Sequence, residues 1–262
     1  MLLIPEDNVT SSKLLKKVTQ FKAASQDSIK SLSTSTLIQS VENASVIIAL
    51  DLSRSTQFGS QGISKRAVAA KIGTLLSFAA QKNGSGIGVL LFSTKIEKYI
   101  PPNTDEDKLH MLITYMMAYK SKHKPTNISH ALHYLSHNKI PSSTVFFLSD
   151  FMDTNYIENL NKCCQKHTLI PIVIEDPREK ELPSVGRVTL EDPETGEQVV
   201  IDTNDMDIKQ RFSNLILSQT LEKDRYLKNA GLSPIYIDNS QDLIGQLQHQ
   251  LNTPTLSQKH AV

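Results

Sequence analysis

The chain has 262 residues, 39% of them hydrophobic, which is enough to bury one full core with at most a small appendage. Its 28 Lys and Arg residues are balanced by 27 Asp and Glu residues, so the formal net charge is only +1 and nucleic-acid binding is disfavoured. The opening MLLIPEDN is too short an apolar run for a signal peptide, and no later run approaches the roughly 20 residues of a membrane span. We therefore expect a cytoplasmic protein with one main domain and no membrane span.

Residues 1–42 differ from the rest of the chain in composition. They are basic in SKLLKKVTQFK and then rich in Ser and Thr, without a strand pattern, which predicts a loose or partly helical amino-terminal arm. A regular alternation of apolar runs and helical stretches begins near Ser45. We expect residues 43–252 to form the main domain and residues 253–262 to form a flexible tail.

Five short, continuous apolar runs are typical of parallel strands that helices cover on both faces. They are SVIIALD (45–51), GIGVLLF (86–92), STVFFLS (143–149), TLIPIVIE (168–175) and SPIYID (233–238). Helical stretches separate or follow them, over residues 65–82, about 105–119, 128–137, 156–167, 208–229 and 241–251. Right-handed strand, helix, strand crossovers then predict an α/β fold with a doubly wound, mostly parallel sheet.

Two segments depart from this alternation. KIEKYIPP (95–102) follows a strand too closely for a crossover, so we expect it to return as an antiparallel edge strand. In RVTLEDPETGEQVVIDT (187–203), two alternating runs flank the turn sequence DPETG. This pattern predicts a β-hairpin, inserted at about residues 176–204, that stands off the main sheet as a recognition element or as a family decoration.

Candidate functional residues follow from the rule that open α/β sheets bind ligands beyond the carboxyl ends of their strands, near the switch point. The first strand ends in Asp51, and Ser53 and Ser55 follow at alternate positions, so their side chains can converge. Asp150 ends a neighbouring strand, and Thr126 lies just before a helix. All five side chains supply oxygen, and none supplies nitrogen or sulfur. Oxygen-only ligation with two carboxylates suits Mg²⁺ or Mn²⁺, and an open coordination position would attract an acidic side chain from a partner protein.

The motif Asp51-x-Ser53-x-Ser55, with Thr126 and Asp150 at later strand ends, resembles the metal-ion-dependent adhesion site of von Willebrand factor A domains. The resemblance implies a von Willebrand factor A, Rossmann-like fold and a protein-binding module rather than an enzyme. It also implies that the serines and the threonine ligate the ion directly or through water. The aspartates would act mostly through water, and a partner carboxylate would complete the shell.

A narrower resemblance covers nearly all of residues 40–250. LDLSRSTQFGS, GVLLFSTKIEKYIPP, FLSDFMD and EDPREKELPSVGRVTLEDPETGEQVVIDT are similar to the bacterial domain-of-unknown-function family fifty-eight. That family is typically associated with MoxR-type AAA+ ATPases, so the resemblance implies such a partner. Members usually carry an upstream stretch with Tyr, Pro-Gly-Asp, Arg and Ile-Asp-Trp, and residues 1–44 contain nothing similar.

Two other hypotheses compete with metal-dependent protein binding. Asp51 could be the nucleophile of a Mg²⁺-dependent phosphatase of the haloacid-dehalogenase type, but such enzymes need a second Asp where this chain has Ser53. His130, His133 and His137 share one face of a helix, which invites a zinc site. Because no carboxylate or cysteine completes that set, we favour a solvated polar face.

Overall fold

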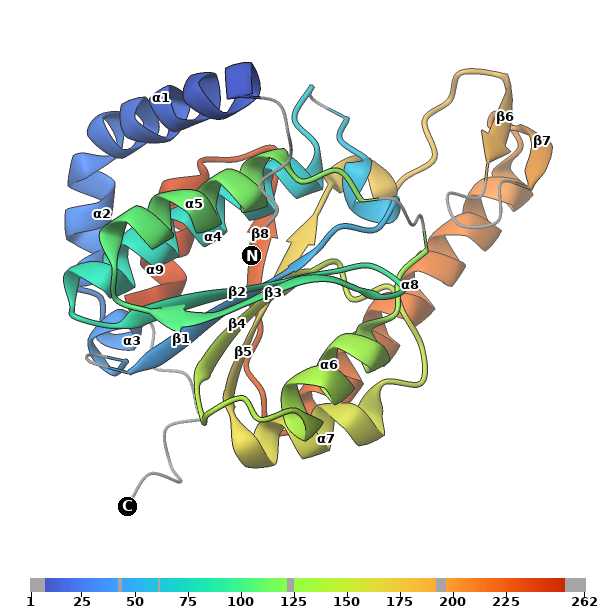
Figure 1. The fold of residues 1–262 in the computed structure, drawn as a ribbon. Coiled ribbons are helices and arrows are strands. Elements are labelled where there is room, and N and C mark those ends of the chain that lie inside the picture. Colours follow the sequence, from blue (N-terminus) through green and yellow to red (C-terminus); the bar gives the residue numbers. More distant parts are fainter. Residues whose placement is uncertain (1–7, 42–43, 61, 122–124, 192–196, 253–262) are drawn as a thin grey trace.

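A computed structural model describes residues 8–41, 44–60, 62–121, 125–191 and 197–252 of the chain (Figure 1). Its centre is a six-stranded sheet in the order β3-β2-β1-β4-β5-β8. The strands are β1 (Ser45–Asp51), β2 (Gly86–Phe92), β3 (Ile96–Asn103), β4 (Thr144–Ser149), β5 (Thr168–Glu175) and β8 (Ile235–Asp238). All neighbours pair in parallel except β2 and β3, which are antiparallel. The predicted mostly parallel sheet and its antiparallel edge strand are therefore confirmed.

Helices cover both faces of this sheet, because successive strand side chains point to opposite faces and both sets are apolar. On one face, Ile48, Leu50 and Phe146 pack under helices that include α4 (Lys65–Lys82), α5 (Glu106–Ala118) and α9 (Leu243–Asn252). On the other face, Ile47 and Phe147 pack under α6 (Ile128–His137) and α7 (Ile157–Lys166). Figure 1 shows these two helical layers, with α4, α5 and α9 above the sheet and α6 and α7 below it.

The amino-terminal segment is helical from residue 8 onwards. It forms α1 (Asn8–Ala24), α2 (Gln26–Ser33) and α3 (Thr36–Gln39). Val18, Leu32 and Ile38 are fully buried and belong to the same apolar cluster as α4 and α5. These helices therefore complete one helical layer of the domain. The division of the chain at residue 42 stays a prediction, and residues 1–7 and the tail expected at 253–262 lie outside the described residues.

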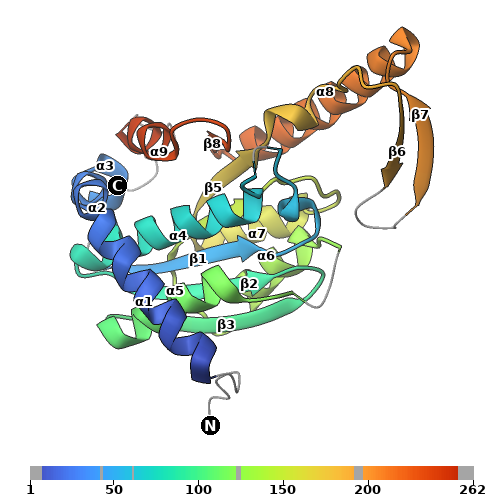
Figure 2. The same cartoon turned by 90° about the horizontal axis from the view of Figure 1, so that it is seen from above.

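The predicted hairpin forms a second, separate sheet. β6 (Arg187–Glu191) pairs antiparallel with β7 (Gln198–Asp202), and the expected turn at 192–196 lies outside the described residues. A long helix, α8 (Met206–Asn229), then leads back to the main sheet. Only Lys223 and Leu227 of α8 are buried, both in its last two turns. We call β6, β7 and the first half of α8 the projecting arm, because they extend beyond the sheet in Figure 2.

No helix in the described part of the chain is both long enough and apolar enough to cross a membrane. Two of the helices near the carboxyl edge begin at capping side chains. Ser64 accepts a hydrogen bond from the Ala67 amide at the start of α4, and Asn127 accepts one from the His130 amide at the start of α6. Both helices therefore start at residues that directly follow loops at the carboxyl edge of the sheet.

Candidate functional site

The loops after β1 and β4 meet at the carboxyl edge of the sheet. The two strands are parallel neighbours, with Leu50 opposite Leu148, so both end at the same level. The chain crosses from β1 to β2 over one face of the sheet, through α4, and enters β4 from the other face, through α6. This reversal is the switch point at which open α/β sheets bind ligands. The structure thus brings the two predicted aspartate loops together.

Asp51 is fully buried at the end of β1 and is held through both carboxylate oxygens. The Ser53 amide donates to Oδ1 over 2.9 Å, and the Ser149 hydroxyl of β4 donates to Oδ2 over 2.7 Å. The hydroxyls of Ser53 and Ser55 lie 3.0 Å apart. The alternation of the Asp-x-Ser-x-Ser loop therefore places its three polar side chains on one side of the chain.

Asp150 is buried opposite this loop, with 4% of its surface exposed. The Lys65 ammonium donates to its Oδ2 over 2.9 Å, the Met152 amide donates to its Oδ1 over 3.3 Å, and the Ser55 hydroxyl is also a hydrogen-bond partner. Phe151 follows with a φ of 56°, a left-handed conformation that is costly for a residue with a side chain. The turn reverses the chain directly after Asp150 and keeps its carboxylate at the sheet edge. Four of the predicted residues, Asp51, Ser53, Ser55 and Asp150, thus come together.

The two buried carboxyls differ in their electrostatic environment. Burial, followed by repulsion from the Asp150 charge, raises the pKa of Asp51 well above its ordinary value. Burial also acts to raise the pKa of Asp150, but the charge and hydrogen bond of Lys65 outweigh it and hold that pKa below its usual range. Lys65 therefore neutralises Asp150, and no cation of the described residues is paired with Asp51.

Thr126 occupies the loop before α6 and is half-buried. The following amide, that of Asn127, donates to the Ser93 carbonyl over 3.1 Å, directly after the end of β2. This hydrogen bond ties the loop to the carboxyl edge, since β2 is the other neighbour of β1. Part of the same loop, residues 122–124, lies outside the described residues. The role of Thr126 as a ligand stays a prediction.

Sequence reasoning missed Lys65, Glu179 and Ser149. Lys65 has only 3% of its side chain exposed, and its ammonium also donates to Glu179 Oε1 over 2.6 Å. A lysine at the first position of a helix gives no sign in sequence that it is buried, because lysine is ordinarily exposed there. Glu179 lies in the EDPRE segment, which carries the family resemblance but gives no local sign of a contact with a lysine.

The donor set fits a hard divalent cation. It consists of carboxylate and hydroxyl oxygens. The Asp51 carboxylate is buried and has no cationic partner within the described part of the chain, an arrangement that a metal ion would stabilise. Within the described ranges, no group of three or more His, Cys, Asp and Glu residues is arranged to hold a metal. An ion at this edge would therefore depend on the hydroxyls and on water as well as on Asp51 and Asp150. Such mixed, partly hydrated shells are typical of Mg²⁺.

The histidine face of α6 agrees with the solvated interpretation. His130, His133 and His137 are exposed, while Ile128, Ala131, Leu132 and Leu135 on the opposite face are buried. The rings of His133 and His137 stack with their centroids 4.0 Å apart. Their neighbours on this face are backbone carbonyls, Ser136 and each other.

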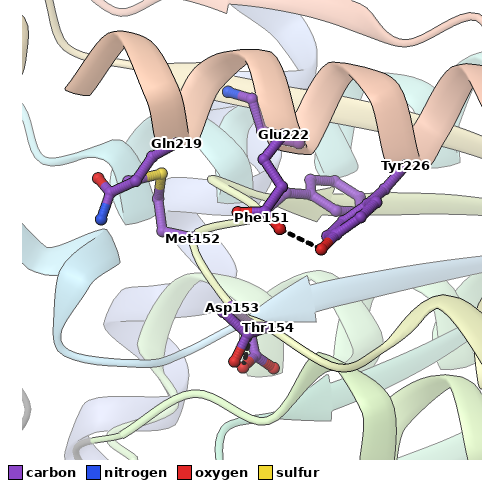
Figure 3. Close-up of a pocket in the computed structure, with 8 residues that line it drawn as sticks. Phe151, Met152, Asp153, Thr154, Gln219, Glu222 and Tyr226 are labelled. Atoms are coloured by element: carbon purple, nitrogen blue, oxygen red, sulfur yellow. Dashed lines mark hydrogen bonds between the residues drawn. The ribbon is translucent and has the colours of Figure 1, made fainter. Parts of the chain in front are cut away.

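Apolar side chains surround the candidate site on its exposed side. Phe58 and Ile63, in the loop after β1, are 44% and 42% exposed, and Met152, in the loop after β4, is 43% exposed. Next to Met152 lies a small pocket of about 60 Å³, lined by residues 151–154 and by Gln219, Glu222, Lys223 and Tyr226 of α8 (Figure 3). In Figure 3, Tyr226 donates a hydrogen bond to Glu222. A rim of exposed apolar residues beside a recess is typical of a surface that contacts another protein.

Comparisons with known proteins identify the family and the fold. The family model described as "Protein of unknown function DUF58" matches residues 33–222. The uncharacterized proteins Rv1480 of Mycobacterium tuberculosis and Mb1516 of Mycobacterium bovis are each 22% identical over 204 residues, which is 76% of this chain. The crystal structure of the conserved hypothetical protein BatB from Bacteroides thetaiotaomicron is similar with a TM-score of 0.52 and 14% identity, covering 79% of this chain and 97% of that chain.

These matches differ in the share of each protein that they cover and in their sequence identity. The aligned segment spans only 64% of the length of the mycobacterial relatives, so it is shorter than the whole of those proteins. At 14% identity, the likeness to BatB shows the fold alone. The match of the family model extends from α2 into α8 and includes every residue of the candidate site.

Proposed function

The chain belongs to the DUF58 family, and we propose that it is a von Willebrand factor A-type module that binds a protein partner through a divalent metal. Asp51, Ser53, Ser55, Thr126 and Asp150 would hold Mg²⁺ or Mn²⁺ as a metal-ion-dependent adhesion site. The observation that carries the proposal is the pair of buried carboxylates, Asp51 and Asp150, of which Lys65 neutralises only one. Because an isolated buried charge is costly, this edge favours a cation.

Partner binding would use the metal and its surroundings together. The bound ion supplies a Lewis-acidic position that accepts a carboxylate oxygen from outside. Phe58, Ile63 and Met152 would pack against apolar side chains that flank the partner's acidic residue. We propose a MoxR-type AAA+ ATPase in the cytoplasm as this partner, as the sequence resemblance implies.

The direct test of the metal site is Mn²⁺ titration of the purified chain by calorimetry. We expect one bound ion for the natural sequence, and loss of binding in Asp51→Ala and Asp150→Ala. Glu158→Ala is a matched control, because it removes an exposed carboxylate of α7 that pairs with Lys162 across one turn. Unchanged Mn²⁺ binding in both aspartate variants would refute the site.

The test of partner binding is pull-down of a purified MoxR-type ATPase from the same organism. Capture should require Mg²⁺, disappear in chelator, and be lost in Asp51→Ala while Glu158→Ala retains it. Capture that persists in chelator would show that the contact does not pass through the metal.

An enzymatic function with Asp51 as nucleophile is disfavoured by its burial and its sequence context. The side chain is 0% exposed, and Ser53 stands where phosphatases of this type carry the second Asp that their chemistry needs. We therefore propose a non-catalytic module. Hydrolysis of a phosphate ester that is lost in Asp51→Asn would contradict this proposal.

A further inference from the structure

Lys65 is a buried cation at the centre of the candidate site. It begins α4, and its backbone amide donates to the Phe58 carbonyl over 2.8 Å, which closes the loop after β1 onto the helix. Its ammonium lies 2.9 Å from Asp150 Oδ2 and 2.6 Å from Glu179 Oε1. Burial alone would lower the pKa of Lys65, but the charges of Asp150 and Glu179 raise it, so the side chain stays positively charged.

Glu179 is held in place by its own segment. It ends the short 3₁₀ helix η2 (Pro177–Glu179), which Asp176 caps by accepting from the Arg178 amide. Both the amide and the hydroxyl of Ser60, in the loop after β1, donate to Asp176 over 2.7 Å. The Glu179 carboxylate is therefore fixed relative to the Asp-x-Ser-x-Ser loop, and it gives Lys65 a second anchor beside Asp150.

The charges in this cluster do not balance. Asp51, Asp150 and Glu179 contribute three carboxylates, and Lys65 is the cation that contacts two of them. With all four groups ionised, as they would be in the metal-bound site, the three carboxylates and the one ammonium give the cluster a net charge of −2. A single divalent ion would neutralise this charge. Without the Lys65 ammonium, the cluster would have a net charge of −3 and would attract the ion more strongly.

We propose that Lys65 is a built-in counter-cation that competes with the divalent metal for Asp150 and sets the affinity of the site for it. Without metal, Lys65 keeps the Asp150 carboxylate charged and oriented. With a divalent ion held by Asp150, the Lys65 ammonium would shift towards Glu179, to which it already donates a hydrogen bond. Glu179 thus acts as the alternative position for Lys65. The inference rests on the proposed function, because it concerns the same metal.

The test is Mn²⁺ titration of the full chain by calorimetry, in the natural sequence and in Lys65→Met. We expect the variant to bind Mn²⁺ at least about tenfold more tightly, because a positive charge a few ångströms from the ion has been removed. Lys65→Arg keeps the charge and should stay close to the natural affinity. Affinity in Lys65→Met that is equal to or weaker than the natural one would overturn the inference, since a purely structural ion pair predicts that result.

A second variant keeps the proposal testable if Lys65→Met does not fold. Glu179→Gln removes the alternative anchor and concentrates the ammonium on Asp150, so Mn²⁺ should bind several-fold more weakly. Equal or tighter binding in Glu179→Gln would contradict the inference. Thermal unfolding in chelator and in Mn²⁺ reports whether each variant is folded.

The outcomes separate the two proposals. If the natural chain binds Mn²⁺ and Asp150→Ala does not, the metal site stands, and the Lys65 variants alone decide the present inference. If neither the natural chain nor Lys65→Met binds Mn²⁺, both proposals fail. Binding by Lys65→Met alone would support Lys65 as the competitor that excludes the ion.

Discussion

At the scale of single residues, two buried aspartates at the ends of adjacent strands differ in how easily they ionise. Asp51 and Asp150 are almost equally inaccessible to water. Their pKa values shift in opposite directions, because only Asp150 contacts the Lys65 ammonium. Burial by itself penalises both charges, so the position of one lysine decides which aspartate is the stable anion.

The raised pKa of Asp51 predicts how stability depends on pH in the metal-free protein. The folded state holds a proton on Asp51 at pH values where the unfolded chain has released it, so the free energy of unfolding should fall as the pH rises from about 4 towards neutrality. Urea denaturation in chelator at several pH values measures this trend. Asp51→Asn should remove most of the decline, and Mg²⁺ at neutral pH should restore stability to the natural chain. A decline that is equally steep in Asp51→Asn would assign the trend to other groups.

At the scale of elements, η2 and the loop after β1 act as one unit at the edge of the sheet. Asp176 accepts hydrogen bonds from Ser60, from Arg178 and from the Asn239 side chain after β8. Ser60 and Asn239, which are 116 and 63 residues from Asp176 in the sequence, therefore meet at its carboxylate. This connection positions both Glu179 and the apolar rim around Phe58.

Asp176→Asn should destabilise the fold at neutral pH by about 2 kcal/mol. Burial acts to raise the pKa of Asp176, but the hydrogen bonds from Ser60 and Asn239 outweigh it and hold the pKa at about 2. Because the pKa of Asp176 is lower in the folded state, its ionised carboxylate stabilises the fold at pH values above the pKa of the unfolded chain, which is near 4. This contribution is lost as the pH falls from there towards 2. Chemical denaturation at pH 7 and pH 3 checks the size and the direction. Asp107→Asn, on the first turn of α5, is an exposed control that should change stability little.

At the scale of the whole molecule, the domain carries an arm that is separate from its core. The hairpin β6–β7 forms its own sheet, and the first half of α8 buries no side chain. Met206, Leu215, Leu217 and Leu221 on α8, and Val199 and Val200 on β7, are large hydrophobic residues that are more than half exposed. Such surfaces contribute little to the stability of the domain and are available for contacts with other molecules.

Deleting the hairpin should therefore leave the domain folded. At its base, the Thr203 amide donates to the Gly186 carbonyl over 2.9 Å, so a short Gly-Ser linker can replace residues 187–202. We expect the melting temperature to change by no more than about 4 °C, and Mn²⁺ affinity to stay unchanged. Thermal unfolding and calorimetry measure both. Loss of cooperative unfolding in the deletion variant would show that the arm supports the core.

The order, type and approximate bounds of the strands and helices from β1 to α9 can be predicted from the sequence alone, because each buried strand is a short apolar run that local patterns reveal. The sequence also indicates which loops reach the carboxyl edge, since the chain direction of parallel strands dictates this. Only the tertiary structure decided that Lys65 and Glu179 belong to the site, that Ser149 and Ser53 hold Asp51, and that residues 8–39 complete a helical layer. These facts depend on burial and on contacts between segments far apart in the chain, which no local pattern in a sequence records.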